Sequence, residues 1–161
     1  MDLRPDELAG VVDMFGALTA EELQEALAEL AFKQGEEYAP DSFAGDIERA
    51  TEGYHLVAVD PDAASGDRSS GDDEIDELLV AGPVAFPELP ENAEDLAHIM
   101  DVTARSVDRE TAGEAAVERF RREVDAAERD ERVSTLVDVS YELEAWASVD
   151  LSDARERLDQ K

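Results

Sequence analysis

The stretch that decides the fold runs from Thr19 to Val59 and reads TAEELQEALAELAFKQGEEYAPDSFAGDIERATEGYHLVAV. Thr19 and Glu22 have the spacing of a capping box, in which each side chain accepts a hydrogen bond from the other residue's backbone N–H. A helix should therefore begin just after Thr19, and Gly35 is a typical residue to end it.

A second helix and a strand are predicted in the same stretch. Asp41 or Ser42 is a candidate cap, Gly53 ends the helix, and Tyr54–Val59 is rich in the β-branched and aromatic residues typical of strands. One more helix before the stretch and a second strand at 78–86 complete the pattern. This order of three helices and two strands is that of a winged helix-turn-helix.

Two regions are expected along the chain. Residues 1–87 should form the winged-helix-like module, and residues 88–161 should form a helical C-terminal region docked on it, because the linker Pro87–Pro90 is short and stiff. The fold class is therefore α+β, mostly helical. The first helix of the C-terminal region should carry one apolar face made of Leu96, Ile99, Met100 and Val107.

The composition is strongly acidic, with 43 Asp and Glu against 14 Lys and Arg and a net charge of −29. Many carboxylates with only two lysines, Lys33 and Lys161, are typical of cytosolic proteins of extreme halophiles. Molar salt shortens the Debye length to about 3 Å and so screens the repulsion between carboxylates. The absence of Cys excludes disulfides and thiolate chemistry. No segment resembles a signal peptide or a membrane span, which predicts a cytoplasmic location and no membrane association.

Nucleic-acid binding by the third helix and the wing would depend on two residues, Arg49 and Arg68. Phosphate contacts supply most of the affinity of DNA-binding proteins, and they come largely from Lys and Arg. Both arginines stand among carboxylates, so DNA binding is the alternative interpretation and contact with proteins is the favoured one.

Motifs for catalysis, cofactors and metals are weak. Residues 66–71 have the glycine spacing of a phosphate loop but lack the Lys that follows it, and the acidic run from Asp60 lacks the later ligands of a calcium loop. Asp95, His98 and Asp101 recur at every third residue, a spacing that drifts around a helix. We therefore assign no catalytic, cofactor-binding or metal-ligating residue, and an enzyme that uses carboxylates is the third interpretation.

Arginines are concentrated in the C-terminal region. Arg119 and Glu123 have i, i+4 spacing, and Glu118 has i, i+3 and i, i+4 spacing to Arg121 and Arg122. Such pairs typically stabilise an exposed helix face by a few tenths of a kcal/mol. The sequence therefore predicts ordinary surface ion pairs here.

A surplus of apolar side chains predicts an interface. Phe32 falls on the side of its helix that faces away from the three-helix core, and Val139, Tyr141 and Trp146 widen the apolar stripe of the helix at 133–149. We expect one face of 133–149 to cover Phe32 and the other, with Trp146 as anchor, to meet a second copy or a protein partner.

Three stretches carry a resemblance to a known family: ELAGVVDMFGALTAEELQEALAELAFKQGE (7–36), GPVAFPELPENAEDLAHIMDV (82–102) and VDVSYELEAWASV (137–149). They resemble a family of uncharacterised haloarchaeal proteins over nearly the whole chain. The resemblance implies one shared architecture and a halophilic setting, and it implies no activity. We therefore expect a non-enzymatic regulatory or adaptor protein that acts through protein contacts.

Overall fold

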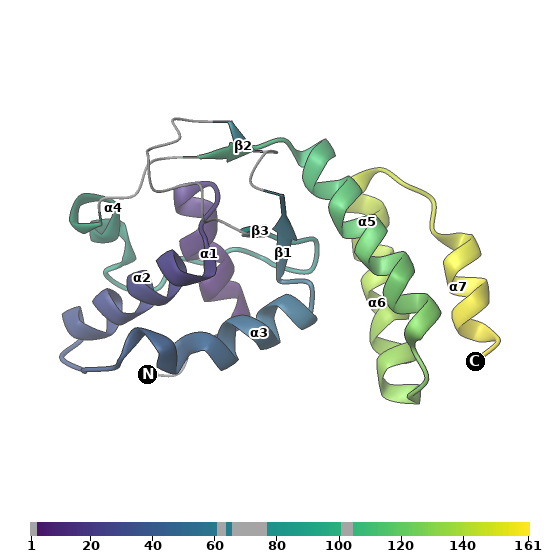
Figure 1. Ribbon diagram of the computed structural model, residues 1–161, viewed down its shortest axis with the longest axis horizontal. Coiled ribbons are helices and arrows are strands. Elements are labelled where there is room, and N and C mark those ends of the chain that lie inside the picture. Colours follow the sequence, from purple (N-terminus) through teal and green to yellow (C-terminus); the bar gives the residue numbers. More distant parts are fainter. Residues whose placement is uncertain (1–2, 61–63, 66–76, 101–104) are drawn as a thin grey trace.

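The computed structural model describes residues 3–60, 64–65, 77–100 and 105–161. Arg68, the glycine motif at 66–71 and Asp101 therefore lie outside the described residues. The architecture has three parts: helices α1–α3, a small sheet, and helices α5–α7, with the sheet between the two groups of helices (Figure 1).

Helix α1 (Pro5–Phe15) precedes α2 (Ala20–Lys33), which begins where the capping box predicts. Proline occupies the first position of α1, where its missing N–H costs nothing. The capping box of α2 is formed: Glu22 N donates to Thr19 Oγ1 at 3.0 Å, and Thr19 N donates to Glu22 Oε1 at 2.9 Å. The predicted start of this helix is confirmed.

The third helix begins at Ala44, slightly later than predicted, after a 3-10 turn that the sequence did not predict. A 3-10 turn, η1 (Pro40–Phe43), leads directly into α3 (Ala44–Glu52). Ser42 Oγ donates to the carbonyl oxygen of Ala39 at 2.6 Å. The prediction that Asp41 or Ser42 caps α3 is wrong, because both residues lie inside the 3-10 turn.

The sheet pairs β1 (Leu56–Val59) with β3 (Leu78–Ala81) in antiparallel register. On the other edge of β3, Leu18 forms an isolated bridge with Leu79, through hydrogen bonds of 3.1 and 2.7 Å. The chain between α1 and α2 is thus held against the sheet. A second short antiparallel pair joins β2 (Ala64–Ser65) to β4 (Ser106–Val107).

Both faces of the β1–β3 sheet are buried, each against a different core. Side chains alternate along a strand, so neighbouring residues point to opposite faces. Leu56 and Leu79 pack into the first core with α1, α2 and α3, which also takes in Ala93 and Leu96. Val57, Val59, Leu78 and Val80 pack into the second core, whose C-terminal members are Ala112, Ala116, Phe120, Val124, Ala127, Leu136, Val139, Leu143, Leu151, Ala154 and Leu158.

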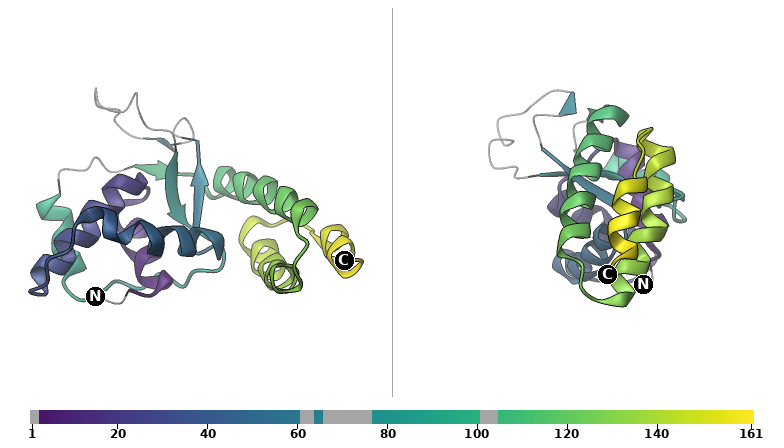
Figure 2. Two further views of the ribbon diagram at one scale, coloured as in Figure 1. Left: turned by 60° about the horizontal axis from the view of Figure 1, so that its bottom comes forward. Right: turned by 90° about the vertical axis from the view of Figure 1, so that its right-hand side faces the viewer.

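The second core is built by α5 (Arg109–Ala126), α6 (Asp130–Ala147) and α7 (Ser152–Asp159). Helices α5 and α6 form an antiparallel hairpin beside the sheet, and α7 packs against both (Figure 2). A Cβ on Gly113 would lie 3.1 Å from the Cβ of Ala147, so the glycine allows α5 and α6 to approach closely at this end. The hairpin therefore brings the start of α5 next to the end of α6.

The segment after the sheet differs from its prediction. Only η4 (Ala93–Asp95) and α4 (Leu96–Ile99) are helical, and Val107 lies in β4, so the predicted continuous face from Leu96 to Val107 is wrong. Strand β3 ends at Ala81, although Val84 N still donates to Tyr54 O at 3.2 Å. The mostly helical α+β class is confirmed. The division at residues 87 and 88 stays a prediction.

Candidate functional site

The outward face of α3 is the first candidate surface. Its exposed residues include Asp41 at the preceding turn, Glu48, Arg49 and Glu52. Arg49 is 69% exposed and forms an ion pair with Asp46, so its charge is balanced within its own helix. The described part of this face is therefore acidic in balance.

The four predicted interface residues lie in different surroundings. Val139 is 3% exposed and belongs to the second core, so its assignment to an interface is corrected. Tyr141 is 59% exposed and Trp146 is half-buried. Their role in an interface stays a prediction. The guanidinium of Arg155 lies 4.3 Å from the ring centre of Tyr141.

Phe32 is 66% exposed, so the prediction that the helix at 133–149 covers it is wrong. Helix α6 packs against α5 and α7 in the second core, on the opposite side of the sheet from α2 (Figure 1). The C-terminal helices pack on the second face of the sheet rather than on α2, because that apolar face would otherwise be exposed. Phe32 itself points to solvent from the outer face of α2.

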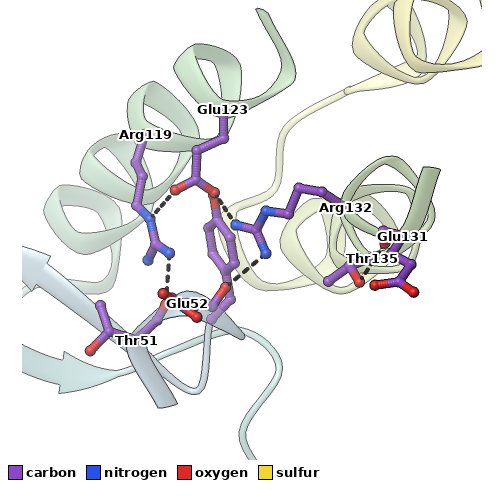
Figure 3. A network of polar contacts seen from close by, with 8 residues as sticks. Thr51, Glu52, Arg119, Glu123, Glu131, Arg132 and Thr135 are labelled. Carbon is purple, nitrogen blue, oxygen red and sulfur yellow. Dashed lines mark hydrogen bonds and ion pairs between the residues drawn. The ribbon is translucent and has the colours of Figure 1, made fainter. Parts of the chain in front are cut away.

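A network of polar side chains joins α3 to the α5–α6 hairpin (Figure 3). Tyr54 is fully buried, and its hydroxyl donates to Glu123 Oε1 at 2.6 Å. Arg119 Nε donates to Glu123 Oε2 at 2.8 Å, and its guanidinium carbon lies 3.9 Å from the ring centre of Tyr54. Tyr54 has a φ of 64°, a left-handed conformation that is strained for a large side chain. The strained residue is thus the one whose ring and hydroxyl join the end of α3 to α5.

Arg132 extends the same network from α6. Its Nη2 donates to Glu123 Oε1 at 2.5 Å, and its Nη1 donates to the carbonyl oxygen of Glu52 at 3.2 Å. Arg119 Nη2 donates to the carbonyl oxygen of Thr51 at 2.7 Å. Two guanidinium groups thus meet the last carbonyls of α3, where the helix dipole is negative. We name this set, Tyr54, Arg119, Glu123 and Arg132, the α3 latch.

The pKa values in the α3 latch follow from this arrangement. Burial opposes ionisation of Glu123, but hydrogen bonds from Tyr54 and Arg119 and the positive charges of Arg119 and Arg132 outweigh it and lower its pKa. Burial and the hydrogen bond to Glu123 raise the pKa of the Tyr54 hydroxyl. The carboxylate therefore stays ionised and the phenol stays protonated, as their hydrogen bond requires.

A cavity of about 680 Å³ lies beside the α3 latch, between the ends of α3 and α5 and the start of α6. It is lined by both kinds of charge, from Glu52, Glu123, Glu128, Arg129, Glu131 and Arg132. Arg132, the latch arginine that lines it, is paired with Glu123, and none of the described lining residues is aromatic. The cavity offers space without a defined set of recognition groups.

A second cavity, of about 280 Å³, lies at the opposite end of the hairpin. It is enclosed by the end of α1, the end of β3 and the chain after it, the start of α5 and the end of α6. Arg109 stacks on Trp146 there, with its guanidinium carbon 4.7 Å from the ring centre. Gly16, with a φ of 90°, closes the α1 side, because a Cβ on it would lie 1.9 Å from the carbonyl oxygen of Arg105.

Metal and acid-base candidates are sparse in the described part of the chain. None of its His, Cys, Asp and Glu residues form a group of three or more that could hold a metal ion. Asp95 is engaged by Lys33 at 3.1 Å and His98 is exposed. Burial lowers the pKa of His55, whose Nε2 lies 4.0 Å from Asp6 Oδ1. None of the described helices is long and apolar enough to span a membrane.

A comparison with protein families places the chain. A model described as a family of unknown function (DUF7109) matches residues 6–161. The chain belongs to this family. The match to DUF7109 runs from α1 to α7, so both cores and both cavities lie within it. The prediction of an uncharacterised family is confirmed. No curated protein and no solved structure matches the chain.

Sequence reasoning found part of the α3 latch. The Arg119–Glu123 pair forms as its i, i+4 spacing predicts, but it is half-buried rather than an ordinary surface pair. Arg121 pairs with Asp153 of α7 at 3.0 Å rather than with Glu118. Tyr54 is 69 residues from Glu123, and no spacing rule joins them. The one available signal was a Tyr directly after the Gly53 helix stop, where a tight turn changes the direction of the chain.

Proposed function

We propose that residues 1–87 form a winged-helix scaffold that acts as a non-enzymatic regulatory or adaptor module. The order α1, α2, α3, β1, β3 supports the scaffold. The bridge between Leu18 and Leu79 supports it further, because it places a third extended segment, between α1 and α2, at the edge of the sheet. Helix α3 then occupies the position from which this class of scaffold meets its partner.

The partner that fits this surface best is a protein with a basic face. The observation that carries the proposal is the exposed acidic face of α3, where the side chains of Asp41, Glu48 and Glu52 form no ion pair with any described residue and Arg49 is engaged by Asp46. Such a face repels phosphates and attracts Lys and Arg. Binding of DNA through α3 is therefore the less favoured alternative.

The setting that accords with the composition is the cytoplasm of a haloarchaeon, where molar salt screens the charge of −29. Screening also weakens long-range attraction between partners. Specificity then depends on short-range contacts at the α3 face rather than on steering.

The test compares three proteins of the same fold: the wild type, an Asp41→Lys/Glu48→Lys variant, and an equally charged control, Glu114→Lys/Glu118→Lys. The control residues are exposed on α5, away from α3. Each protein is immobilised at molar KCl and exposed to cell extract and to genomic DNA fragments. We expect one or more proteins to be retained by the wild type and the control and lost with the α3 variant.

Two outcomes would contradict the proposal. The first is an identical set of retained proteins for all three baits. The second is sequence-selective retention of DNA that Arg49→Glu abolishes, which would establish the nucleic-acid alternative. Thermal melts of all three baits exclude unfolding as the cause of any loss.

A further inference from the structure

The small cavity at the junction of α1, α5 and α6 holds two opposite charges that do not meet. Asp13, in the last turn of α1, and Arg109, at the start of α5, both line it. Neither side chain forms an ion pair within 4.0 Å with any described residue. Both side chains are exposed to solvent. A ligand that carries both charges could satisfy both groups at once.

The backbone around the cavity has the same polarity. The last carbonyls of α1 give its end a partial negative charge, and the first N–H groups of α5 give its start a partial positive charge. Asp108 precedes α5 without making a side-chain cap hydrogen bond, so it does not occupy those N–H groups. An ammonium group is favoured at the α1 side and a carboxylate at the α5 side.

The remaining wall is apolar and aromatic. The half-buried indole of Trp146 forms part of it, with Ala85 and Ala112 nearby. Pockets for drug-sized ligands are about 300–1,000 Å³. The cavity of about 280 Å³ lies just below that range, so it suits a small molecule such as an amino acid.

We propose that this cavity binds a free α-amino acid with an apolar side chain. Asp13 accepts hydrogen bonds from its ammonium group, Arg109 donates to its carboxylate, and Trp146 packs against its side chain. The proposal does not depend on the partner of α3, because no residue of the cavity belongs to that face.

The chain offers a direct readout, because Trp146 is its single tryptophan. Leucine, which does not fluoresce, serves as the probe at molar KCl, with indole fluorescence and calorimetry as parallel measurements. We expect saturable binding to the wild type. Arg109→Gln and Asp13→Asn should each raise the Kd about tenfold or more, because each removes a charge-assisted hydrogen bond. Arg122→Gln is the matched control, since Arg122 is exposed on the same helix and should leave the Kd unchanged.

Ligand analogues test the proposal on the wild type, independently of any effect of a variant on folding. Isovalerate lacks the ammonium group and isopentylamine lacks the carboxylate, and both should bind at least about tenfold more weakly than leucine. The absence of saturable binding in both measurements would overturn the proposal. Isovalerate binding as tightly as leucine, or an equal loss with Arg122→Gln, would overturn it too, because the first requires no zwitterion and the second no specific site.

Discussion

The two ends of the α5–α6 hairpin use the same kinds of residue in opposite ways. At the end near α3, Arg119 and Arg132 converge on Glu123 and on backbone carbonyls, so each guanidinium has partners. At the end near α1, Arg109 and Asp13 line one cavity without an ion pair to any residue that the structure describes. Charges that are paired with one another hold parts of a protein together, whereas charges without an ion-pair partner are available to a ligand.

The difference comes from what each end of the hairpin meets. Near α3 the arginines meet the C-terminus of a helix, whose carbonyl oxygens accept their hydrogen bonds. The fully buried hydroxyl of Tyr54 also needs an acceptor there, and Glu123 supplies it. Near α1 the start of α5 meets a short loop and the indole of Trp146, which offers a π face and no acceptor for a guanidinium. The comparison predicts a graded response to mutation.

The largest effect should come from the apolar support of the α3 latch. Phe120 is fully buried, with its ring centre 6.4 Å from that of Tyr54. Phe120→Ala should lower the free energy of unfolding by about 3–5 kcal/mol, because it leaves a cavity in the second core. Phe86→Ala is the control, since Phe86 is 76% exposed, and it should change stability by less than about 0.5 kcal/mol. Denaturant unfolding measures both, and equal effects would mean that the second core does not support the latch.

Removing the charge at the centre of the α3 latch should have the next largest effect. Glu123→Gln keeps an acceptor for Tyr54 but leaves Arg119 and Arg132 without their carboxylate, which should cost about 1–3 kcal/mol. Glu118→Gln removes a carboxylate from the exposed face of the same helix and should cost less than about 0.5 kcal/mol. If the two variants unfold at the same denaturant concentration, the α3 latch does not contribute to the stability of the fold.

The same carboxylate should make stability depend on pH. The folded-state pKa of Glu123 is below its ordinary value of 4.5, so its contribution is fully present well above that pH and is lost as the pH falls through the folded-state pKa. The stability difference between wild type and Glu123→Gln should therefore shrink below pH 4.5. Unfolding curves for both proteins at a series of pH values measure this difference. A constant difference across the acidic range would contradict a lowered pKa.

The smallest effect should come from the open end. Arg109→Gln removes a cation–π contact and no ion pair, so it should change the free energy of unfolding by no more than about 0.5–1 kcal/mol. The measurement is the same denaturant series as for Glu123→Gln. A loss equal to that of Glu123→Gln would show that both ends hold the structure and would remove the distinction between them.

Local signals in the sequence predicted the elements of the first half well. The Thr19–Glu22 capping box, the Gly53 stop and the β-branched run before residue 60 act over a few residues, so they can be read without the fold. Errors appear where tertiary contacts decide. Val107 fits the helical spacing of the apolar residues before it, but it pairs with Ala64 and therefore lies in β4.

The candidate sites were harder to predict for the same reason. Arg119–Glu123 follows helical spacing and was predicted, whereas Tyr54 joins that pair across 69 residues. Asp13, Arg109 and Trp146 come from three helices and share no pattern in the sequence. Phe32 lies on the outer side of its helix as predicted, but α6 does not cover it, because α6 packs in the core on the second face of the sheet, which no local pattern in the sequence indicates.

The sheet with two buried faces has a consequence for synthesis on the ribosome. Leu56 and Leu79 pack against helices that are synthesised before them or shortly after them. Val57, Val59 and Val80 pack against α5 and α6, which are synthesised later. At about 5–20 residues per second, synthesis from the end of β3 to the end of α6 takes about 3–13 seconds, and during this interval one apolar face of the two-stranded sheet has no cover. A nascent chain arrested before α5 should therefore bind chaperones that recognise exposed apolar strands, and one arrested after α6 should release them.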